Sequence, residues 1–496
     1  MPNILAYVVL FSWPIVVLIL FKRLPLNAAI AWSIIGGYLL LPARTGLDLP
    51  LIPAIDKTAI PALTALLMCF ILANSQSQQA MQRRLAAADA RRGIDADGSG
   101  TPVPRSKRHL PPRGKREPVV VVAALLLGLM LVSPIITVLQ NGEPLFGGLR
   151  SLPGLQLYDA FSMIGELAIM IIPFLLARRF FDTEESHVLL LKILALASLG
   201  YTLFAIYELR MGPFLNLNIY GFAQHAFLQH VRDGGFRPMI FLPHGLWVAV
   251  FTAMSVIAAA VLWRVRRAQG KPASLWLLAA LYLFAILIWG KSAGAFYVTV
   301  LLLPCVLLFG VRLQLIVATG FAAIILFYPI VRGTGLVPVN QIYAYVESVS
   351  VQRAQSLQVR LENEEALLAK ANQKPLAGWG GWGRNRVMDE LTGEDRSVTD
   401  GMWIIVIGTY GWLGYIAQFG LVCIPIALLL TRARHVSLAT SGLCLLLTVN
   451  IIDLIPNATL TPVTWIVAGA LMGRYIAIRS SAAKQTVSGR VAMAPG

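Results

Sequence analysis

The sequence predicts an all-α polytopic membrane protein, and its composition and apolar pattern carry this prediction. The chain has 496 residues, of which 57% are hydrophobic, and its mean hydropathy is +0.71. Only 13% of the residues are charged, against roughly 25% in soluble globular proteins. The apolar residues form repeated runs of about 17–25 residues, the length that a helix needs to cross a bilayer. A soluble enzyme, a secreted disulfide scaffold and a disordered chain are therefore excluded.

The apolar runs predict about thirteen transmembrane helices, and an even number follows if the run at 27–42 is re-entrant. The run at 402–430 is too long for one upright helix, which rises about 1.5 Å per residue across about 30 Å of hydrocarbon. Gly411 and Gly414 are the residues expected to break it. The predicted spans cover residues 3–21, 27–42, 58–74, 119–139, 160–177, 188–207, 239–263, 274–290, 294–311, 313–330, 402–430, 437–452 and 462–478.

Basic residues between the spans predict the orientation, because cytoplasmic loops retain Lys and Arg. The segment 75–117 is strongly basic, lacks aromatic residues and is rich in Ala, Gly and Pro, so we expect a disordered cytoplasmic loop. The other basic clusters beside spans then fall on the same side, which leaves the N-terminus outside and the C-terminus in the cytoplasm. The net charge of +17 thus follows from topology, and we expect no nucleic-acid partner.

The predicted organisation has six parts. The outer loops at 208–238 and 331–401 are the two long connections on the side away from the basic loop. In chain order the parts are N-terminal spans at 1–74, the cytoplasmic loop at 75–117, a central membrane domain at 118–330 that contains the first outer loop, the large outer loop at 331–401, C-terminal spans at 402–478 and a cytoplasmic tail at 479–496.

The cysteines give no indication of a metal or redox centre. All four lie in apolar runs, where a thiol packs as a small apolar group. The sequence has no CxxC pair and no His/Cys cluster, so we expect no metal site.

The large outer loop carries nine acidic and eight basic residues, far more than a simple connector needs. Residues 340–372 lack Pro and Gly and predict one amphipathic helix, with Leu357, Leu361 and Leu368 as its apolar stripe. At about 100° per residue, Arg353, Arg360 and Glu364 fall within about 40° of one another. Paired arginines suit phosphate, because each planar guanidinium forms bidentate hydrogen bonds. A solvated Arg–Glu ladder has the same spacing, so both interpretations stand.

A glycine-rich segment follows this helix and reads Gly-Trp-Gly-Gly-Trp-Gly at 378–383. Glycine allows close backbone approach, and the indoles of Trp379 and Trp382 offer flat faces of the kind that stack on sugar rings. A tight turn with its tryptophans in the interfacial aromatic belt fits the same residues.

The first outer loop ends with Arg237, and His244 lies about two turns into the span predicted at 239–263. An ionisable group at the membrane end of a span is a functional candidate by default. For His244 a structural role fits equally well, and His225 and His230 are expected on the loop surface.

These segments resemble the O-antigen ligase and Wzy-type polysaccharide polymerase superfamily of bacterial envelope proteins, from about residue 160 to 478. Ligases of that family carry His-[Asn/Ser/Gln]-x9-Gly-x-x-Gly at the end of the large outer loop. Here Asp400-Gly401 is followed, after nine residues, by Gly411-Trp412-Leu413-Gly414. The aspartate in the histidine position and the Arg-x-x-Ser-Leu-x-x-Arg stretch at 353–360 look more like the exopolysaccharide polymerase branch.

The resemblance implies a helical fold related to the GT-C glycosyltransferases and a metal-independent transfer without a cofactor. A glycan moves from undecaprenyl pyrophosphate to a hydroxyl of another lipid-linked repeat unit, at the outer face of the bacterial inner membrane. The donor carries its own leaving group, because no nucleotide sugar or ATP is expected on that side. Further implied partners are membrane lipid and other assembly proteins, such as a chain-length regulator or a flippase.

The implied roles fall on residues of both outer loops. Asp400 is the leading candidate for the general base, and His244 is the alternative. The pyrophosphate-binding residues are Arg237, Arg353 and Arg360, and the sugar-binding residues are Trp379, Trp382 and Arg384.

Three other functions remain open. The first is ligase-type transfer to another acceptor, the second is transport of lipid-linked sugars, and the third is a non-catalytic membrane subunit. A transporter is expected to line its path with intramembrane charge. The spans are nearly free of charge, with Glu166 as a rare exception, which favours chemistry at the membrane surface.

Overall fold

The computed structural model describes residues 1–49, 52–73, 118–148, 150–232, 234–336, 338–349 and 351–492. The predicted basic loop at 75–117 lies outside the described residues. The described chain is predominantly helical, and its only strands are three short antiparallel hairpins. The hairpins pair β1 (Gly46–Leu47) with β2 (Ile55–Asp56), β3 (Leu145–Gly147) with β4 (Arg150–Leu152), and β5 (Val231–Arg232) with β6 (Gly235–Phe236).

Seven described helices are long and apolar enough to cross a membrane, which confirms the prediction of an all-α polytopic membrane protein. They are α1 (Ile4–Arg23), α4 (Pro118–Leu139), α5 (Leu157–Phe180), α6 (Glu184–Met211), α8 (Gly245–Ala268), α11 (Val311–Gly333) and α14 (Met402–Leu430). Five shorter apolar helices are α2 (Leu26–Leu40), the helix Ala59–Ala73, α9 (Ser274–Trp289), α10 (Ala293–Leu308) and α15 (Leu438–Asp453).

The helices pack around α8, which is buried along most of its length. It packs against α6, α9, α10 and α15. The last long helix, α16 (Pro462–Ala492), lies along α5, where Gly469 and Gly473 permit close approach. A Cβ atom at these glycines would lie 2.2 Å from the carbonyl oxygen of Phe174 and 2.5 Å from that of Arg178. Small residues at such a spacing let membrane helices pack closely through van der Waals contact.

The helix that contains the last predicted span, 462–478, extends beyond it, because α16 continues without a break to Ala492.

The predicted break in the 402–430 run is confirmed at Gly411, which has φ 63° and ψ −163° inside α14. Only glycine adopts this region of backbone conformation readily. A Cβ atom at Gly411 would lie 2.4 Å from the backbone nitrogen of Ala377. The kink therefore lets the segment after residue 371 pack closely against α14.

The prediction of one helix over 340–372 is wrong. The structure has two helices, α12 (Val339–Val349) and α13 (Val351–Ala371), which pack against each other. A straight helix of that length would extend about 50 Å at 1.5 Å per residue. The break instead lets α13 pack on α14, and it buries Leu367 and Leu368. Of the predicted leucine stripe, Leu368 is buried, and Leu357 and Leu361 are half-buried.

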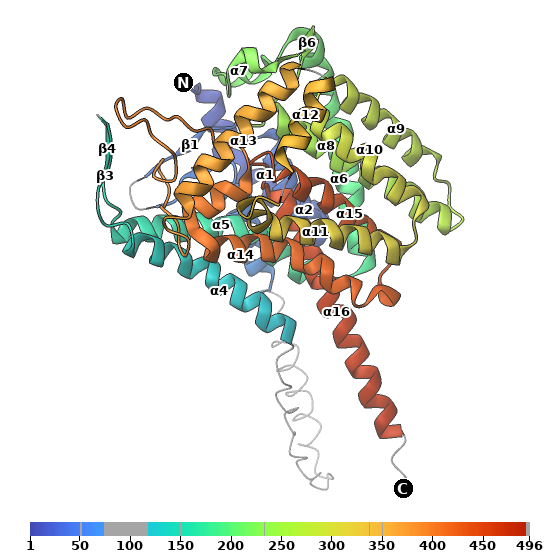
Figure 1. The fold of residues 1–496 in the computed structure, drawn as a ribbon. Helices are drawn as coiled ribbons and strands as arrows, with labels where there is room; N and C mark the ends of the chain where they lie inside the picture. Colours follow the sequence, from blue (N-terminus) through green and yellow to red (C-terminus); the bar gives the residue numbers. More distant parts are fainter. Residues whose placement is uncertain are drawn as a thin grey trace, which may run out of the picture.

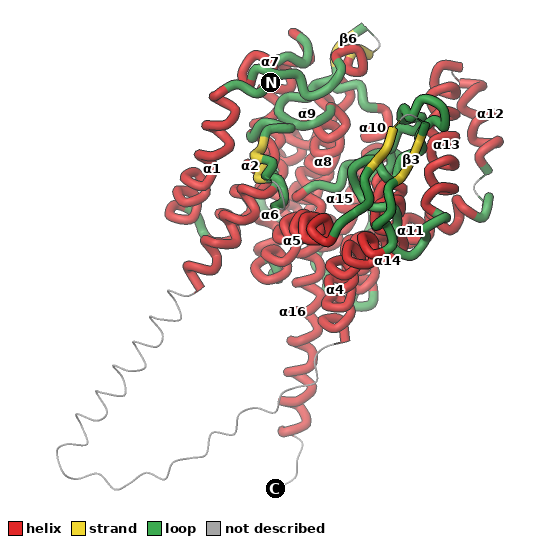
Figure 2. Tube along the Cα trace, turned by 90° about the vertical axis from the view of Figure 1, so that its left-hand side faces the viewer, coloured by secondary structure: helices red, strands yellow, loops and turns green. Residues whose placement is uncertain are grey.

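Segments from both predicted outer loops gather at one end of the molecule. The short helix α7 (Leu215–Tyr220), the β5–β6 hairpin, α12 and α13 lie toward the end that also holds the N-terminus (Figures 1 and 2). The carboxyl-terminal part of α16 projects from the opposite end (Figure 1). Two 3₁₀ turns complete the described elements, at Phe227–His230 and Ala433–His435.

Candidate functional site

Residues 237–244 form the loop that leads into α8, here called the 237–244 loop. The side chain of Glu208 holds this loop in place. Glu208 is fully buried in the last turn of α6. Its carboxylate accepts hydrogen bonds from the backbone N–H groups of Met239 at 2.8 Å and Ile240 at 2.7 Å, and from that of Leu215 at 3.0 Å. Hydrogen bonds to a charged acceptor are the stronger kind, so one side chain ties the two ends of the first outer loop together.

Three other side chains hold the same loop from neighbouring elements. The Nζ of Lys57 donates to the carbonyl of Phe241 at 2.9 Å, and the Nε2 of Gln224 donates to the carbonyl of Ile240 at 2.6 Å. The backbone N–H of Phe241 donates to the hydroxyl of Tyr201 at 3.2 Å. Burial lowers the pKa of Lys57 to about 7. The backbone of the loop is therefore fixed before any ligand binds.

Arg237 is a buried arginine at the start of this loop, with 5% of its surface exposed. Its backbone N–H donates to the carbonyl of His230 at 2.8 Å, and its Nη2 donates to the carbonyl of Lys291 at 3.1 Å. A Cβ atom on Gly245 would lie 2.6 Å from both Cγ and Cδ of Arg237. The glycine that begins α8 thus lets the arginine lie against the amino-terminal end of that helix.

Within the described part of the chain, no carboxylate forms an ion pair with Arg237, and its Nε has no hydrogen-bond partner. The charged groups that act on it are Arg232 and Arg360. Burial, with these two guanidiniums, lowers the pKa of Arg237 to about 10. Buried charges in proteins normally have a counter-ion. The arrangement is therefore suited to an anion that a ligand supplies.

Arg360 and Asp400, which the sequence singles out separately, form an ion pair. The Nε of Arg360, on α13, lies 3.6 Å from the Oδ2 of Asp400, two residues before α14. Each side chain is 41% exposed, so both groups remain open to a ligand. Since Arg360 also acts on Arg237, two of the three predicted pyrophosphate-binding arginines and the predicted base lie in one electrostatic neighbourhood.

Asp453 also belongs to this neighbourhood, and the sequence prediction missed it. It ends α15, and its carboxylate accepts hydrogen bonds from Asn457 at 2.8 Å and Thr459 at 2.6 Å. Arg360 acts on it electrostatically. An acidic residue at the end of an apolar span was the available signal, because such groups are functional candidates.

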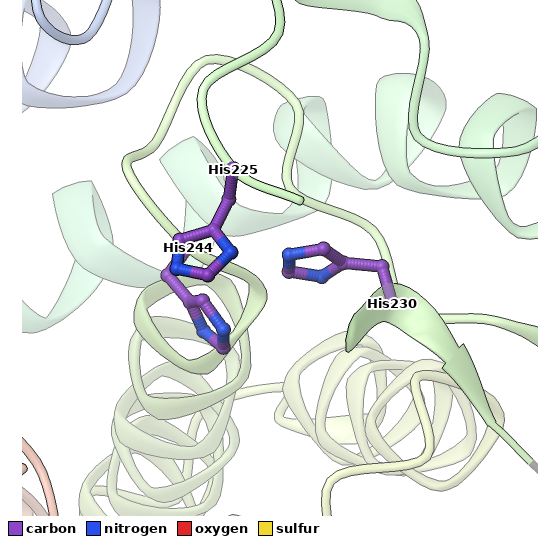
Figure 3. A group of neighbouring side chains, drawn as sticks. All are labelled: His225, His230 and His244. Atoms are coloured by element: carbon purple, nitrogen blue, oxygen red, sulfur yellow. The ribbon is translucent and has the colours of Figure 1, made fainter. Parts of the chain in front are cut away.

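The rings of His225 and His230, in the first outer loop, meet the ring of His244 at the start of α8 (Figure 3). The ring centroids of His230 and His244 are 4.7 Å apart, those of His225 and His244 are 4.8 Å apart, and those of His225 and His230 are 5.7 Å apart. The expectation that His230 lies on the surface is wrong, because its side chain is fully buried. The hydrogen bonds of Glu208 hold the two ends of the first outer loop together and so bring the histidines into contact. The spacing of the histidines in the sequence does not indicate this contact.

His244 lies at the amino-terminal cap of α8 and not inside the span, because the helix begins only at Gly245. Its Nδ1 accepts a hydrogen bond from the backbone N–H of Leu246 at 3.0 Å. Burial, with the other two histidines, lowers the pKa of His244 to about 3, so the ring is neutral and carries its proton on Nε2. A ring in this state donates a hydrogen bond, which makes Asp400 the better candidate for the general base.

The predicted Arg–Glu ladder on the amphipathic helix is wrong for Arg360 and Glu364, which do not pair with each other. Glu364 lies 3.7 Å from the Nε of Arg332 on α11 and is nearly buried, whereas Arg360 pairs with Asp400. Glu364 therefore fastens α13 to α11 and leaves Arg360 facing the site. Arg353 lies on α13, but its side chain is outside the described part, so its predicted role stays a prediction.

Trp379 is anchored within the glycine-rich segment. Its Nε1 donates to the carbonyl of Lys370 at 2.8 Å, and the Nζ of Lys374 lies 4.6 Å from its ring centroid. The ring borders a groove of about 450 Å³ whose lining includes Phe146, Gln373 and Glu390. Aromatic, amide and carboxylate groups in one groove are consistent with a sugar-binding role.

Trp382 and Arg384 differ sharply in their exposure. Trp382 is 54% exposed and has a left-handed φ of 53°, so its indole is presented outward. Arg384 is buried, and its guanidinium donates to three carbonyls, those of Trp379, Pro153 and Glu143. This geometry supports a sugar-facing role for Trp382 but not for Arg384, which holds the segment together.

No family model matches the chain, and no curated protein matches it. The functional conclusion therefore rests on the geometry of the site and on the motifs in the sequence.

The unpaired charge of Arg237 gives a testable prediction about stability. Met fills a similar volume without a charge, so Arg237→Met is expected to stabilise the ligand-free protein by about 1–2 kcal/mol. The midpoint of thermal unfolding in detergent measures this effect.

Arg384→Met is the matched control, because Arg384 is equally buried but its hydrogen bonds are satisfied, and the substitution is expected to destabilise the protein. A lower midpoint for Arg237→Met would mean that Arg237 has a counter-ion after all.

Proposed function

We propose that the protein is a polymerase of cell-surface polysaccharide. It transfers a glycan from undecaprenyl pyrophosphate to a hydroxyl of another lipid-linked repeat unit. The single observation that carries this proposal is Arg237, a buried guanidinium for which the described residues supply no counter-ion. It shares an electrostatic neighbourhood with the accessible pair of Arg360 and Asp400. A pyrophosphate brings to Arg237 the negative charge that the described residues do not supply.

The proposed reaction uses the residues in two roles. Asp400 accepts the proton of the acceptor hydroxyl while its oxygen attacks the anomeric carbon of the donor. The bond between that carbon and the pyrophosphate oxygen breaks, and the electron pair leaves on undecaprenyl pyrophosphate. Arg237 and Arg360, with Arg353, donate hydrogen bonds to the developing charge, a contribution that fixed donors make most effectively in a site shielded from water. The bond that breaks provides the driving force, so the proposal needs neither a metal nor a cofactor.

The sugar units are proposed to lie along the glycine-rich segment. The exposed face of Trp382 and the groove beside Trp379 are the features that support this. An indole face is large, rigid and apolar, and it covers the C–H groups of a sugar ring while polar neighbours bind the hydroxyl groups.

The arrangement in the membrane is part of the same proposal. We infer about thirteen spans in a fold related to the GT-C glycosyltransferases, with the N-terminus outside and the C-terminus in the cytoplasm of a bacterial inner membrane. The basic clusters of the sequence support this orientation. Proposed partners are membrane lipid, the lipid-linked oligosaccharide and other assembly proteins, such as a chain-length regulator or a flippase.

Activity of variants tests the two roles. With purified protein reconstituted with undecaprenyl-pyrophosphate-linked repeat units, Asp400→Asn is expected to slow chain lengthening by about 10²–10⁴-fold, because it removes the base. Arg360→Ala is expected to cost about 10²–10³-fold, because it removes a donor to the leaving group. Gel analysis of the products measures both.

Arg396→Ala is the matched control, because Arg396 forms an exposed ion pair with Asp389 in the same loop, and the variant is expected to keep full activity. Full activity of Asp400→Asn and Arg360→Ala would contradict the proposal. Movement of the lipid-linked sugar across the bilayer without lengthening would instead identify a transporter, and transfer to a different acceptor would identify a ligase.

Labelling of single cysteines tests the orientation. The native cysteines are all buried, so an added surface cysteine can be labelled selectively. A membrane-impermeant maleimide applied to intact spheroplasts is expected to label Leu391→Cys, in the large outer loop, and to label His435→Cys only after lysis; both native side chains are exposed. The opposite pattern would put residues 331–401 in the cytosol and contradict the proposed donor chemistry.

A further inference from the structure

The three-histidine cluster of His225, His230 and His244 has a property that a structural core does not explain. His230 is fully buried, and within the described part of the chain neither ring nitrogen has a hydrogen-bond partner. The hydroxyl of Ser292, next to the carbonyl that Arg237 binds, is also buried without a partner there. Buried polar groups in folded proteins are almost always hydrogen-bonded, so these atoms together point to a ligand.

A divalent metal is the first candidate for three imidazoles, since their ligand atoms lie within 4.8 Å of one another. The hydrogen bonds argue against it. The Nδ1 atoms of His225 and His244 accept bonds from the backbone N–H groups of Ala226 at 2.9 Å and Leu246 at 3.0 Å. A neutral ring with its Nδ1 occupied as an acceptor carries a proton on Nε2 and has no lone pair left for a metal.

The charges near the cluster also disfavour a cation. Arg232 and Arg237 act on both His230 and His244. These two guanidiniums, one from β5 and one from the 237–244 loop, place positive charge beside the imidazoles. The buried carboxylate of Glu208, which holds the 237–244 loop, is already occupied by three backbone N–H groups.

We propose that the three-histidine cluster, together with Arg237, is a proton-linked binding site for a phosphate group. The Nε2–H groups of His225 and His244 and the Nε–H of Arg237 donate to the phosphate oxygens. His230, which has both nitrogens available, takes up a proton as the anion binds and then donates as well. Identifying this phosphate with part of the donor's pyrophosphate rests on the proposed function, but the binding site itself does not.

The direction of the proton linkage follows from the free protein. Without an anion, burial and then the neighbouring His225 and the two arginines lower the pKa of His230 to about 4. A bound dianion opposes both effects and raises that pKa. Anion binding therefore takes up a proton and strengthens as the pH falls.

Sulfate is the probe that isolates this effect, because it remains a dianion throughout the range in which histidine titrates. Calorimetry on the full-length protein in detergent is expected to show sulfate affinity rising by up to about tenfold per pH unit between about pH 7.5 and about pH 5.5. His230→Leu is expected to lose this pH dependence and at least about tenfold of the affinity at the lower pH. It removes no hydrogen bond to any residue that the structure describes, so it is expected to fold as well as the parent.

His435→Gln is the matched control, because His435 is exposed in the 3₁₀ turn at Ala433–His435, and it is expected to bind sulfate like the parent. Competition then identifies the source of the phosphate. Displacement of sulfate by inorganic pyrophosphate supports a site for the donor's leaving group, and displacement only in nanodiscs containing phosphatidylglycerol supports a lipid headgroup.

Two results would overturn the proposal. One is sulfate binding that does not change with pH or in His230→Leu. The other is stoichiometric Zn²⁺ binding that His230→Leu abolishes, without any binding of sulfate, which would mark a metal site. Neither result requires a lipid-linked sugar, so the phosphate site can fail while chain lengthening succeeds, and the reverse also holds.

Discussion

The site depends on the buried guanidinium of Arg237, a positive charge that is kept out of water. No residue that the structure describes supplies a counter-ion for it. Arg237 is held there because the loop that carries it is fixed by Glu208, whose carboxylate accepts three backbone N–H groups. Gly245 makes room for the arginine against α8, and Arg360 adds a second guanidinium nearby. Such an arrangement costs stability in the free protein, and it stabilises an anion that arrives with its charge already in place.

The rest of the fold supplies rigid attachment for this end of the molecule. The kink at Gly411 lets the glycine-rich segment pack closely against α14. The ion pair of Glu364 with Arg332 joins α13 to α11. Arg360 and Asp400 consequently approach each other from two elements that are each anchored in the membrane helices. A site on fixed elements needs little reorganisation when charge develops during the reaction, which is the condition for strong electrostatic stabilisation.

The sequence was sufficient for the membrane class and for part of the site, and the reasons are physical. A bilayer imposes length and apolarity on each span, so the class could be predicted from composition alone. The kink could be predicted because the 402–430 run is too long for one upright helix and because glycine, present at Gly411, adopts that backbone conformation readily. The split between α12 and α13 and the burial of His230 could not be predicted, because they depend on contacts between residues far apart in the chain.

The central claim is that the leaving pyrophosphate neutralises Arg237. A structure of the protein in a nanodisc with an undecaprenyl-pyrophosphate donor analogue bound tests it most directly. The account predicts phosphate oxygens within hydrogen-bond distance of the Nε of Arg237 and of the guanidinium of Arg360, with the sugar directed toward Asp400. A pyrophosphate bound elsewhere, with Arg237 still unpaired, would contradict it.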